Sequence, residues 1–301
     1  MLTAAKNGHL EVVTLLLDEG AALEQRDWEV GTALTHAALH GFSDVAGELL
    51  DRGANREAQT DFLWTSIMVA ADEGHVRTVR VLVNKGADAR HLNQNGETAL
   101  HRAALGGHVE VMRLLLDEGV DVDHQCSGNG YTALMHAAQN GYLEAVRLLL
   151  GVGRVDVNKL ELEEGGAAVE LKRLDGNTAL SFATNRNHTE VVRLLLEHGA
   201  DATSENDKQE GVLMYAAEAG NLEVSQMLLD RGARADQRGG TGSWTPLMWA
   251  AQNGHEDVAR LLMISGSRPD ARSCKCCLLR TCLSCFPLSC SADQLSCLNL
   301  S

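Results

Sequence analysis

The sequence predicts an all-α solenoid in which short helix pairs are stacked along residues 1–270. Two observations indicate this fold class. Pairs of alanines recur at steps of 33 or 34 residues, with one longer step of 46. A glycine follows fifteen residues after every pair. A fixed period of this length is typical of repeat proteins, whose units must stack to bury their apolar faces. Seven repeats have their alanine pairs at Ala4, Ala37, Ala70, Ala103, Ala137, Ala216 and Ala250, and Ala183-Thr184 takes this place in the sixth of the eight repeats.

Each repeat is predicted to open with a short helix that begins after a threonine. In six repeats this threonine lies five residues before the first alanine, and Gly211 replaces it once. A threonine hydroxyl can accept a hydrogen bond from a free N–H at a helix start, and Pro246 after Thr245 suits a first helical turn. The small alanines allow a neighbouring helix to approach closely. The glycine three residues after the pair permits the left-handed turn that ends the helix.

A second, amphipathic helix is predicted to follow in each repeat. In residues 109–118 the apolar side chains recur at three- and four-residue spacing, as one buried helix face requires. Gly119 is expected to end this helix in a left-handed conformation, and about ten polar residues then lead to the next threonine. Histidines such as His108 follow the first glycine in several repeats, which favours a structural role over catalysis.

The long step between the fifth and sixth repeats predicts an insertion over residues 159–174. Residues 160–162 and 169–171 each alternate apolar with charged side chains, and Gly165-Gly166 lies between them. This alternation is typical of half-exposed strands, and the glycines can take the positive φ of a hairpin turn. We therefore expect the insertion to form a hairpin that projects from the stack of helix pairs. An acidic disordered loop and a short helix over residues 167–174 remain alternatives.

The two ends depart from the repeat. The chain begins inside the first helix of a truncated repeat, so we expect it to be a piece of a longer protein; a natural short start is the alternative. Residues 271–301 keep none of the repeat and hold seven of the eight cysteines. We expect a poorly ordered Cys-rich tail there, with a zinc site or palmitoylation as alternatives.

The repeated residues carry a family resemblance. Residues 97–104 (ETALHRAA) and 244–251 (WTPLMWAA) resemble the T-P-L-H-x-A-A signature of ankyrin repeats. The later elements Gly107-His108 and LVNKGA at residues 82–87 match as well. The resemblance implies helix pairs joined by β-hairpin fingers in a slightly curved stack, and protein binding without catalysis. Only His101 keeps the histidine of the signature, so a Thr–His hydrogen bond is expected in the fourth repeat alone.

Composition limits the class of partner. The net charge is −15, which disfavours binding to nucleic acid and favours a protein partner with a basic patch. No apolar run approaches the roughly 20 residues of a membrane span. The few cysteines before residue 270 indicate a reducing compartment, most simply the cytoplasm. His36 and His40 share a helix face without a third ligand, so we expect no metal. No G-x-x-x-x-G-K-[ST] loop occurs and no nucleophile lies in a recognised setting, so we expect no cofactor and no catalytic residue. A monomer is expected.

Aromatic residues indicate where a partner binds. Trp64, Tyr131 and Trp244 directly precede a capping threonine, a finger position that often contacts partners in ankyrin repeat proteins, as do the residues after each alanine pair. Packing of these aromatics on the next finger is the alternative. We expect partner contacts at Trp28, Trp64, Asp72, Glu73, Gln94, Asn95, Glu97, Tyr131, Gln139, Asn140, Trp244, Gln252 and Asn253.

Two functions fit these residues. The first is a stand-alone protein-interaction scaffold that binds through its fingers and its concave helix face. The second is the recognition part of a larger protein, such as an enzyme or a ubiquitin-ligase subunit, whose active domain lies elsewhere.

Overall fold

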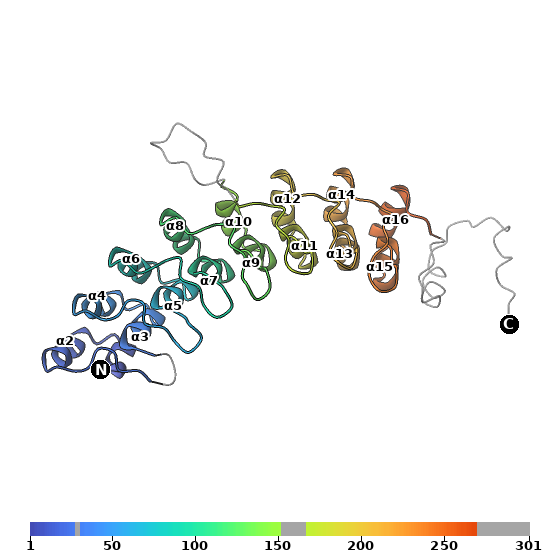
Figure 1. Ribbon diagram of the computed structural model, residues 1–301. Coiled ribbons are helices and arrows are strands. Elements are labelled where there is room, and N and C mark those ends of the chain that lie inside the picture. Colours follow the sequence, from blue (N-terminus) through green and yellow to red (C-terminus); the bar gives the residue numbers. More distant parts are fainter. Residues whose placement is uncertain (28–30, 152–166, 270–301) are drawn as a thin grey trace, which may run out of the picture. The chain divides into compact units, whose positions relative to one another are not determined.

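The computed structural model describes residues 1–27, 31–151 and 167–269, in which all helices belong to repeated pairs. The chain divides into two compact units, Met1–Asp207 and Lys208–Ser301. Each unit is a stack of helix pairs, so the predicted all-α repeat architecture is confirmed for the described residues (Figure 1). That residues 1–270 form one uninterrupted solenoid stays a prediction. Trp28, the predicted contact nearest the N-terminus, and the Cys-rich tail from residue 271 onward lie outside the described residues.

The first unit contains six helix pairs in its described part. The first helices of the pairs are α1 (Leu2–Lys6), α3 (Ala33–Leu39), α5 (Ser66–Asp72), α7 (Ala99–Gly106), α9 (Ala133–Asn140) and α11 (Ala179–Asn185). The second helices are α2 (Leu10–Asp18), α4 (Ser43–Asp51), α6 (Val76–Asn84), α8 (Val109–Asp117), α10 (Leu143–Leu149) and α12 (Thr189–Glu197). Successive first helices contact one another, as do successive second helices, so the unit has two helix layers.

The second unit contains two helix pairs in its described part. They are α13 (Val212–Ala219) with α14 (Leu222–Asp230), and α15 (Pro246–Asn253) with α16 (Glu256–Ile264). The same layering holds here, because α13 contacts α15 and α14 contacts α16. In both units the alanine pairs are buried, apart from half-buried Ala251. Their small side chains allow the first helices to pack closely.

The predicted threonine caps are present at the starts of the first helices. The hydroxyls of Thr32, Thr132, Thr178 and Thr245 each accept a hydrogen bond from the N–H three residues on, at 3.2–3.4 Å. Thr98 forms the expected pair with His101, whose Nδ1 lies 2.9 Å from the threonine Oγ1. Thr65 begins α5 without such a bond, and its hydroxyl is buried without a partner.

A histidine of the next repeat packs against the glycine that follows the first helix at four positions, Gly41, Gly74, Gly141 and Gly220. Gly41 and its equivalents have φ near +75°, as predicted, and Asn187 takes the same conformation at +62°. A Cβ on Gly41 would lie 2.6 Å from His75 Nδ1, so the position also has no room for a side chain. The ring Nε2 of His75 donates to the carbonyl oxygen of Leu39 in the preceding repeat at 3.0 Å. His108, His188 and His255 make the equivalent bond, which confirms the structural role predicted for His75, His108 and His255.

The insertion ends earlier in the chain than the sequence predicted. The Ala167 N–H donates to the Leu149 carbonyl at 2.7 Å, as Ala54 does to Leu49 and Ala87 to Leu82 in earlier repeats. Residues 167–177 therefore occupy the place of an ordinary finger. The predicted second hairpin arm is wrong, because residues 169 and 170 lie in a turn and Leu171 belongs to no strand, and no helix forms over residues 167–174. The other arm lies outside the described residues.

A contact between repeats explains the turn. Glu170 Oε1 accepts a hydrogen bond from the Asp201 N–H of the next repeat at 2.8 Å. Glu57 makes the same bond to the Asp88 N–H at 2.9 Å, one of several acidic side chains that join neighbouring repeats in this way. The glutamate that alternates with apolar residues in the sequence is thus part of the stack.

Two deletions distinguish the insertion from the finger. Deleting residues 154–166 removes thirteen residues and shortens the step of 46 to 33, so we expect the melting temperature to change by no more than about 2 °C. Deleting residues 160–171, by contrast, removes Ala167 and Glu170, and with them the hydrogen bonds to the Leu149 carbonyl and from the Asp201 N–H. We expect that deletion to lower the melting temperature by about 4 °C or more. Equal melting temperatures in thermal circular dichroism would contradict this placement.

Candidate partner-binding surface

The predicted contact residues divide into exposed and buried groups. Glu73, Gln94, Asn95 and Asn140 of the first unit and Gln252 and Asn253 of the second are exposed, whereas Trp64, Asp72, Gln139 and Trp244 are half-buried and Glu97 and Tyr131 are buried. Asn140 and Asn253 each donate to a carbonyl oxygen of the preceding repeat, Leu105 and Glu218, at 3.2 and 2.9 Å. The ends of the first helices are therefore fixed in place rather than free.

Backbone hydrogen bonds join the finger tips of the first unit. The Gln94 N–H donates to the Phe62 carbonyl at 3.2 Å, and the Gly128 N–H donates to the Asn95 carbonyl at 3.3 Å. The resemblance implied hairpin fingers, but the described fingers are turns that contain only isolated bridges, such as Gln59 with Thr65. The loops project from the layer of first helices (Figure 1). The tips consequently form one connected row.

The finger tips expose apolar side chains that the sequence analysis missed. Phe62 is 67% exposed and Leu63 is 44% exposed, and Leu92 and Leu174 in later fingers are also exposed. Leu63 has φ of +60°, a left-handed conformation that is unusual for a branched side chain. The signal was available in the sequence, because Phe62-Leu63 stands in an otherwise polar connecting stretch.

Arg102 holds the predicted cluster of Trp64 and Asp72 together. Its guanidinium carbon lies 4.6 Å from the centre of the Trp64 ring. Its Nη2 lies 2.7 Å from Asp72 Oδ1, and its Nη1 lies 3.6 Å from Glu97 Oε1. The Asp72 carboxylate is therefore already paired within the protein. Glu73 beside it is the exposed acid of this cluster.

The structure corrects the prediction for Tyr131. Its side chain is buried, with the ring stacked on His136 at 4.6 Å between centroids and on Phe182 at 5.2 Å. Its hydroxyl accepts a hydrogen bond from Arg173 Nη1 at 3.0 Å. The sequence left packing on the next finger as the alternative, and that alternative holds here because Arg173 and Phe182 belong to the next repeat.

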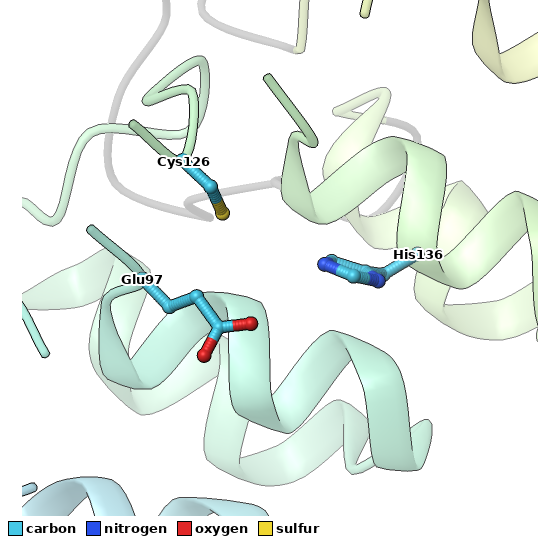
Figure 2. Close-up of side chains that lie close together, drawn as sticks. All are labelled: Glu97, Cys126 and His136. Carbon is cyan, nitrogen blue, oxygen red and sulfur yellow. The ribbon is translucent and has the colours of Figure 1, made fainter. Parts of the chain in front are cut away.

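Glu97 is also buried rather than available to a partner. Its Oε2 accepts a hydrogen bond from Asn93 Nδ2 at 2.7 Å, and only 7% of the residue is exposed. Figure 2 shows its carboxylate, the Cys126 thiol and the His136 ring converging on a common space between two fingers and α9. These three side chains offer ligand atoms within 4.8 Å of one another.

Burial controls the protonation of this cluster. Burial, with the nearby His101 ring as a second cause, lowers the pKa of His136 to about 4, so the imidazole is neutral at pH 7. Burial raises the pKa of Cys126 to about 12, and the Glu97 carboxylate adds to this effect. A thiol with so high a pKa is a poor nucleophile. Burial also lowers the pKa of His101, whose ring centre lies 6.1 Å from that of His136, to about 4.

Comparison with known proteins identifies the family. The family model for ankyrin repeats matches residues 1–60, 67–161, 152–239 and 205–273. The chain belongs to the ankyrin repeat family. The ankyrin repeat domain of human ASB11 has a TM-score of 0.64 at 25% identity, covering 78% of this chain and 98% of that one. The ankyrin repeat domain of Bcl-3, a member of the IkappaB protein family, has a TM-score of 0.62 at 28% identity, covering 76% and 96%.

Other comparisons add two facts. A search of curated proteins gave no significant match. Among the described residues, every helix of this ankyrin repeat protein is too short or too polar to cross a membrane. Ankyrin repeat domains are generally protein–protein interaction modules.

Proposed function

We propose that this ankyrin repeat protein is a non-catalytic scaffold that binds a protein partner through the finger tips and adjacent first-helix ends of its first unit. The observation that carries the proposal is the connected row of finger tips, which presents exposed Phe62 beside exposed Gln94 and Asn95. Apolar side chains on a rigid polar surface are favourable for association, because little conformational freedom is lost on binding.

Charge supports a partner with a basic patch. The chain has a net charge of −15, and Asp61 at the finger tip and Glu73 at the end of α5 are both exposed. Opposite charges across an interface accelerate encounter, and salt screens this attraction. The proposal therefore includes a monomer that meets a basic protein surface. The single cysteine before residue 270 supports a location inside the cell.

We also include in the proposed binding surface the other predicted contact residues whose side chains are exposed or half-buried. Trp64 presents the part of its ring that Arg102 does not cover, and Gln139 and Asn140 lie at the end of α9. In the second unit Trp244, Gln252 and Asn253 form the equivalent set, with Trp244 packed against Trp249 at 4.8 Å. We exclude Glu97 and Tyr131 because their side chains are buried.

A matched pair of exposed apolar residues tests the binding surface. Partners are captured from the native cell, and their affinity is measured for the purified wild type and for the double variant Phe62→Ser with Gln94→Ala. We expect this double variant to weaken the partner at least tenfold, or about 1.4 kcal/mol. The control is Leu15→Ser, because Leu15 is 60% exposed on α2 in the layer of second helices. It should change affinity less than twofold.

If Leu15→Ser weakens binding and the double variant does not, the binding site lies in the layer of second helices and the proposal is contradicted.

The salt dependence of association tests the charge argument independently. The association rate should fall as sodium chloride rises from about 50 to 300 mM, since the Debye length shortens over this range. An unchanged rate would contradict the basic-patch part alone.

A further inference from the structure

Two repeats place a histidine at the same position but give it different partners. His36 and His136 each lie four residues after a capping threonine, Thr32 and Thr132. Facing them, Asp27 and Cys126 occupy the same finger position, because each donates its N–H to the residue just before the capping threonine. In the second repeat one ring nitrogen is paired, because His36 Nε2 lies 2.6 Å from Asp27 Oδ2, and only Nδ1 makes no hydrogen bond.

In the fifth repeat the aspartate is replaced by Cys126, and the histidine has no partner. His136 is only 8% exposed, yet neither Nδ1 nor Nε2 makes a hydrogen bond. A buried polar group without a partner is costly, and such groups in native proteins require an explanation. The ring is also fixed in orientation, because it is stacked on Tyr131 and meets the His101 ring edge-on at 6.1 Å.

We propose that Glu97, Cys126 and His136 bind a Zn²⁺ ion. The three side chains come from two neighbouring fingers and α9, and all three are buried. A thiolate, an imidazole and a carboxylate are the ligands that zinc takes, whereas Mg²⁺ and Ca²⁺ prefer oxygen ligands alone. Three protein ligands leave a fourth position for water, as is usual in open zinc sites.

The geometry requires only a small closure. The ligand atoms lie within 4.8 Å of one another, and the ligand atoms of a tetrahedral zinc site lie roughly 3.3–3.8 Å apart, given bonds of about 2.0–2.3 Å. Rotation of the long Glu97 side chain can supply most of the difference of about 1 Å, at the expense of the 2.7 Å hydrogen bond from Asn93 Nδ2 to Glu97 Oε2. Arg102 does not oppose this movement strongly, because its contact with Asp72 at 2.7 Å is shorter than its 3.6 Å contact with Glu97.

The charges balance in the bound state. The Cys126 thiol loses its proton to solvent as the sulfur–zinc bond forms, and Glu97 binds as a carboxylate. Two ligand charges then neutralise Zn²⁺, which suits a site whose three protein ligands are buried. Zinc would also satisfy one of the two unpartnered nitrogens of His136.

The test uses the full chain with one thiol left. Serine replaces the seven cysteines at Cys274, Cys276, Cys277, Cys282, Cys285, Cys290 and Cys297, so that Cys126 is the only candidate thiolate. After treatment with a chelator, zinc is titrated calorimetrically, and Co²⁺ serves as a spectroscopic probe. We expect one equivalent of zinc, a thiolate-to-cobalt charge-transfer band, and a melting temperature raised by zinc but not by Mg²⁺ or Ca²⁺.

Three variants in this background decide the assignment. Cys126→Val and His136→Gln should each weaken zinc binding at least tenfold, and Cys126→Val should abolish the charge-transfer band. His36→Gln, the same change at the equivalent position of the second repeat, should leave both unchanged. Circular dichroism checks that each variant is folded, and if His136→Gln is not, Cys126→Val still tests the site. Absence of zinc binding in the parent chain, or equal binding in Cys126→Val, would overturn the proposal.

Discussion

Replacing Tyr131 with alanine is expected to lower the free energy of unfolding of the first unit by about 3–4 kcal/mol. The residue is 8% exposed and its ring is stacked between His136 of its own repeat and Phe182 of the next. Alanine would leave a cavity between two repeats, and Arg173, whose guanidinium carbon lies 5.0 Å from the ring centre, would lose this packing and the hydroxyl acceptor. Urea denaturation followed by circular dichroism measures the effect.

Tyr131→Phe is the matched control for this prediction. It keeps the stacked ring and removes only the hydrogen bond from Arg173 Nη1, so the expected loss is about 1 kcal/mol. A loss below about 1 kcal/mol for Tyr131→Ala would show that the ring is not part of the core. In that case the residue would return to the set of exposed contacts that the sequence predicted.

Acidification is expected to destabilise the metal-free first unit between about pH 6.5 and pH 4. His101 and His136 have pKa values lowered from 6.5 to about 4, chiefly by burial. The unfolded chain therefore binds more protons than the native one across this interval, so stability is present above pH 6.5 and is lost as the pH falls. At pH 4.5 each imidazole accounts for about 2–3 kcal/mol. Glu97, Arg102 and His124 are the other titratable groups that influence these two rings, and Cys126 lies close to His136.

Variants separate the two imidazoles in this prediction. His101→Ser copies Ser181, which forms the same capping box with Thr178 in the sixth repeat, and His136→Gln removes the second titrating ring. Denaturation midpoints in buffer with a chelator are compared at pH 7.5 and 4.5. Each variant should lose less stability on acidification than wild type, and the double variant should lose least. The same loss in all four proteins would show that other groups govern the acid sensitivity.

The candidate surface could be predicted only in part, because neighbouring repeats decide which side chains are exposed. Trp64 and Tyr131 have the same sequence position, directly before a capping threonine. Trp64 stays half-buried beneath Arg102, whereas Tyr131 is covered by Phe182 and Arg173. The residues that cover them lie 38 to 51 positions away in the sequence, at positions where the repeats differ from one another. A pattern within one repeat carries no information about such neighbours.

Sequence alone determined the helix pairs, their threonine caps and the left-handed glycines, since these features depend on residues within one repeat and recur along the chain. Tertiary structure alone decided that Glu170 joins the stack instead of a hairpin, through its bond to the Asp201 N–H. It also decided that His136 faces Cys126 and Glu97 without a hydrogen bond, while His36 at the equivalent position pairs with Asp27. The physical reason is that hydrogen bonding and burial at these positions depend on side chains that stacking brings together from different repeats.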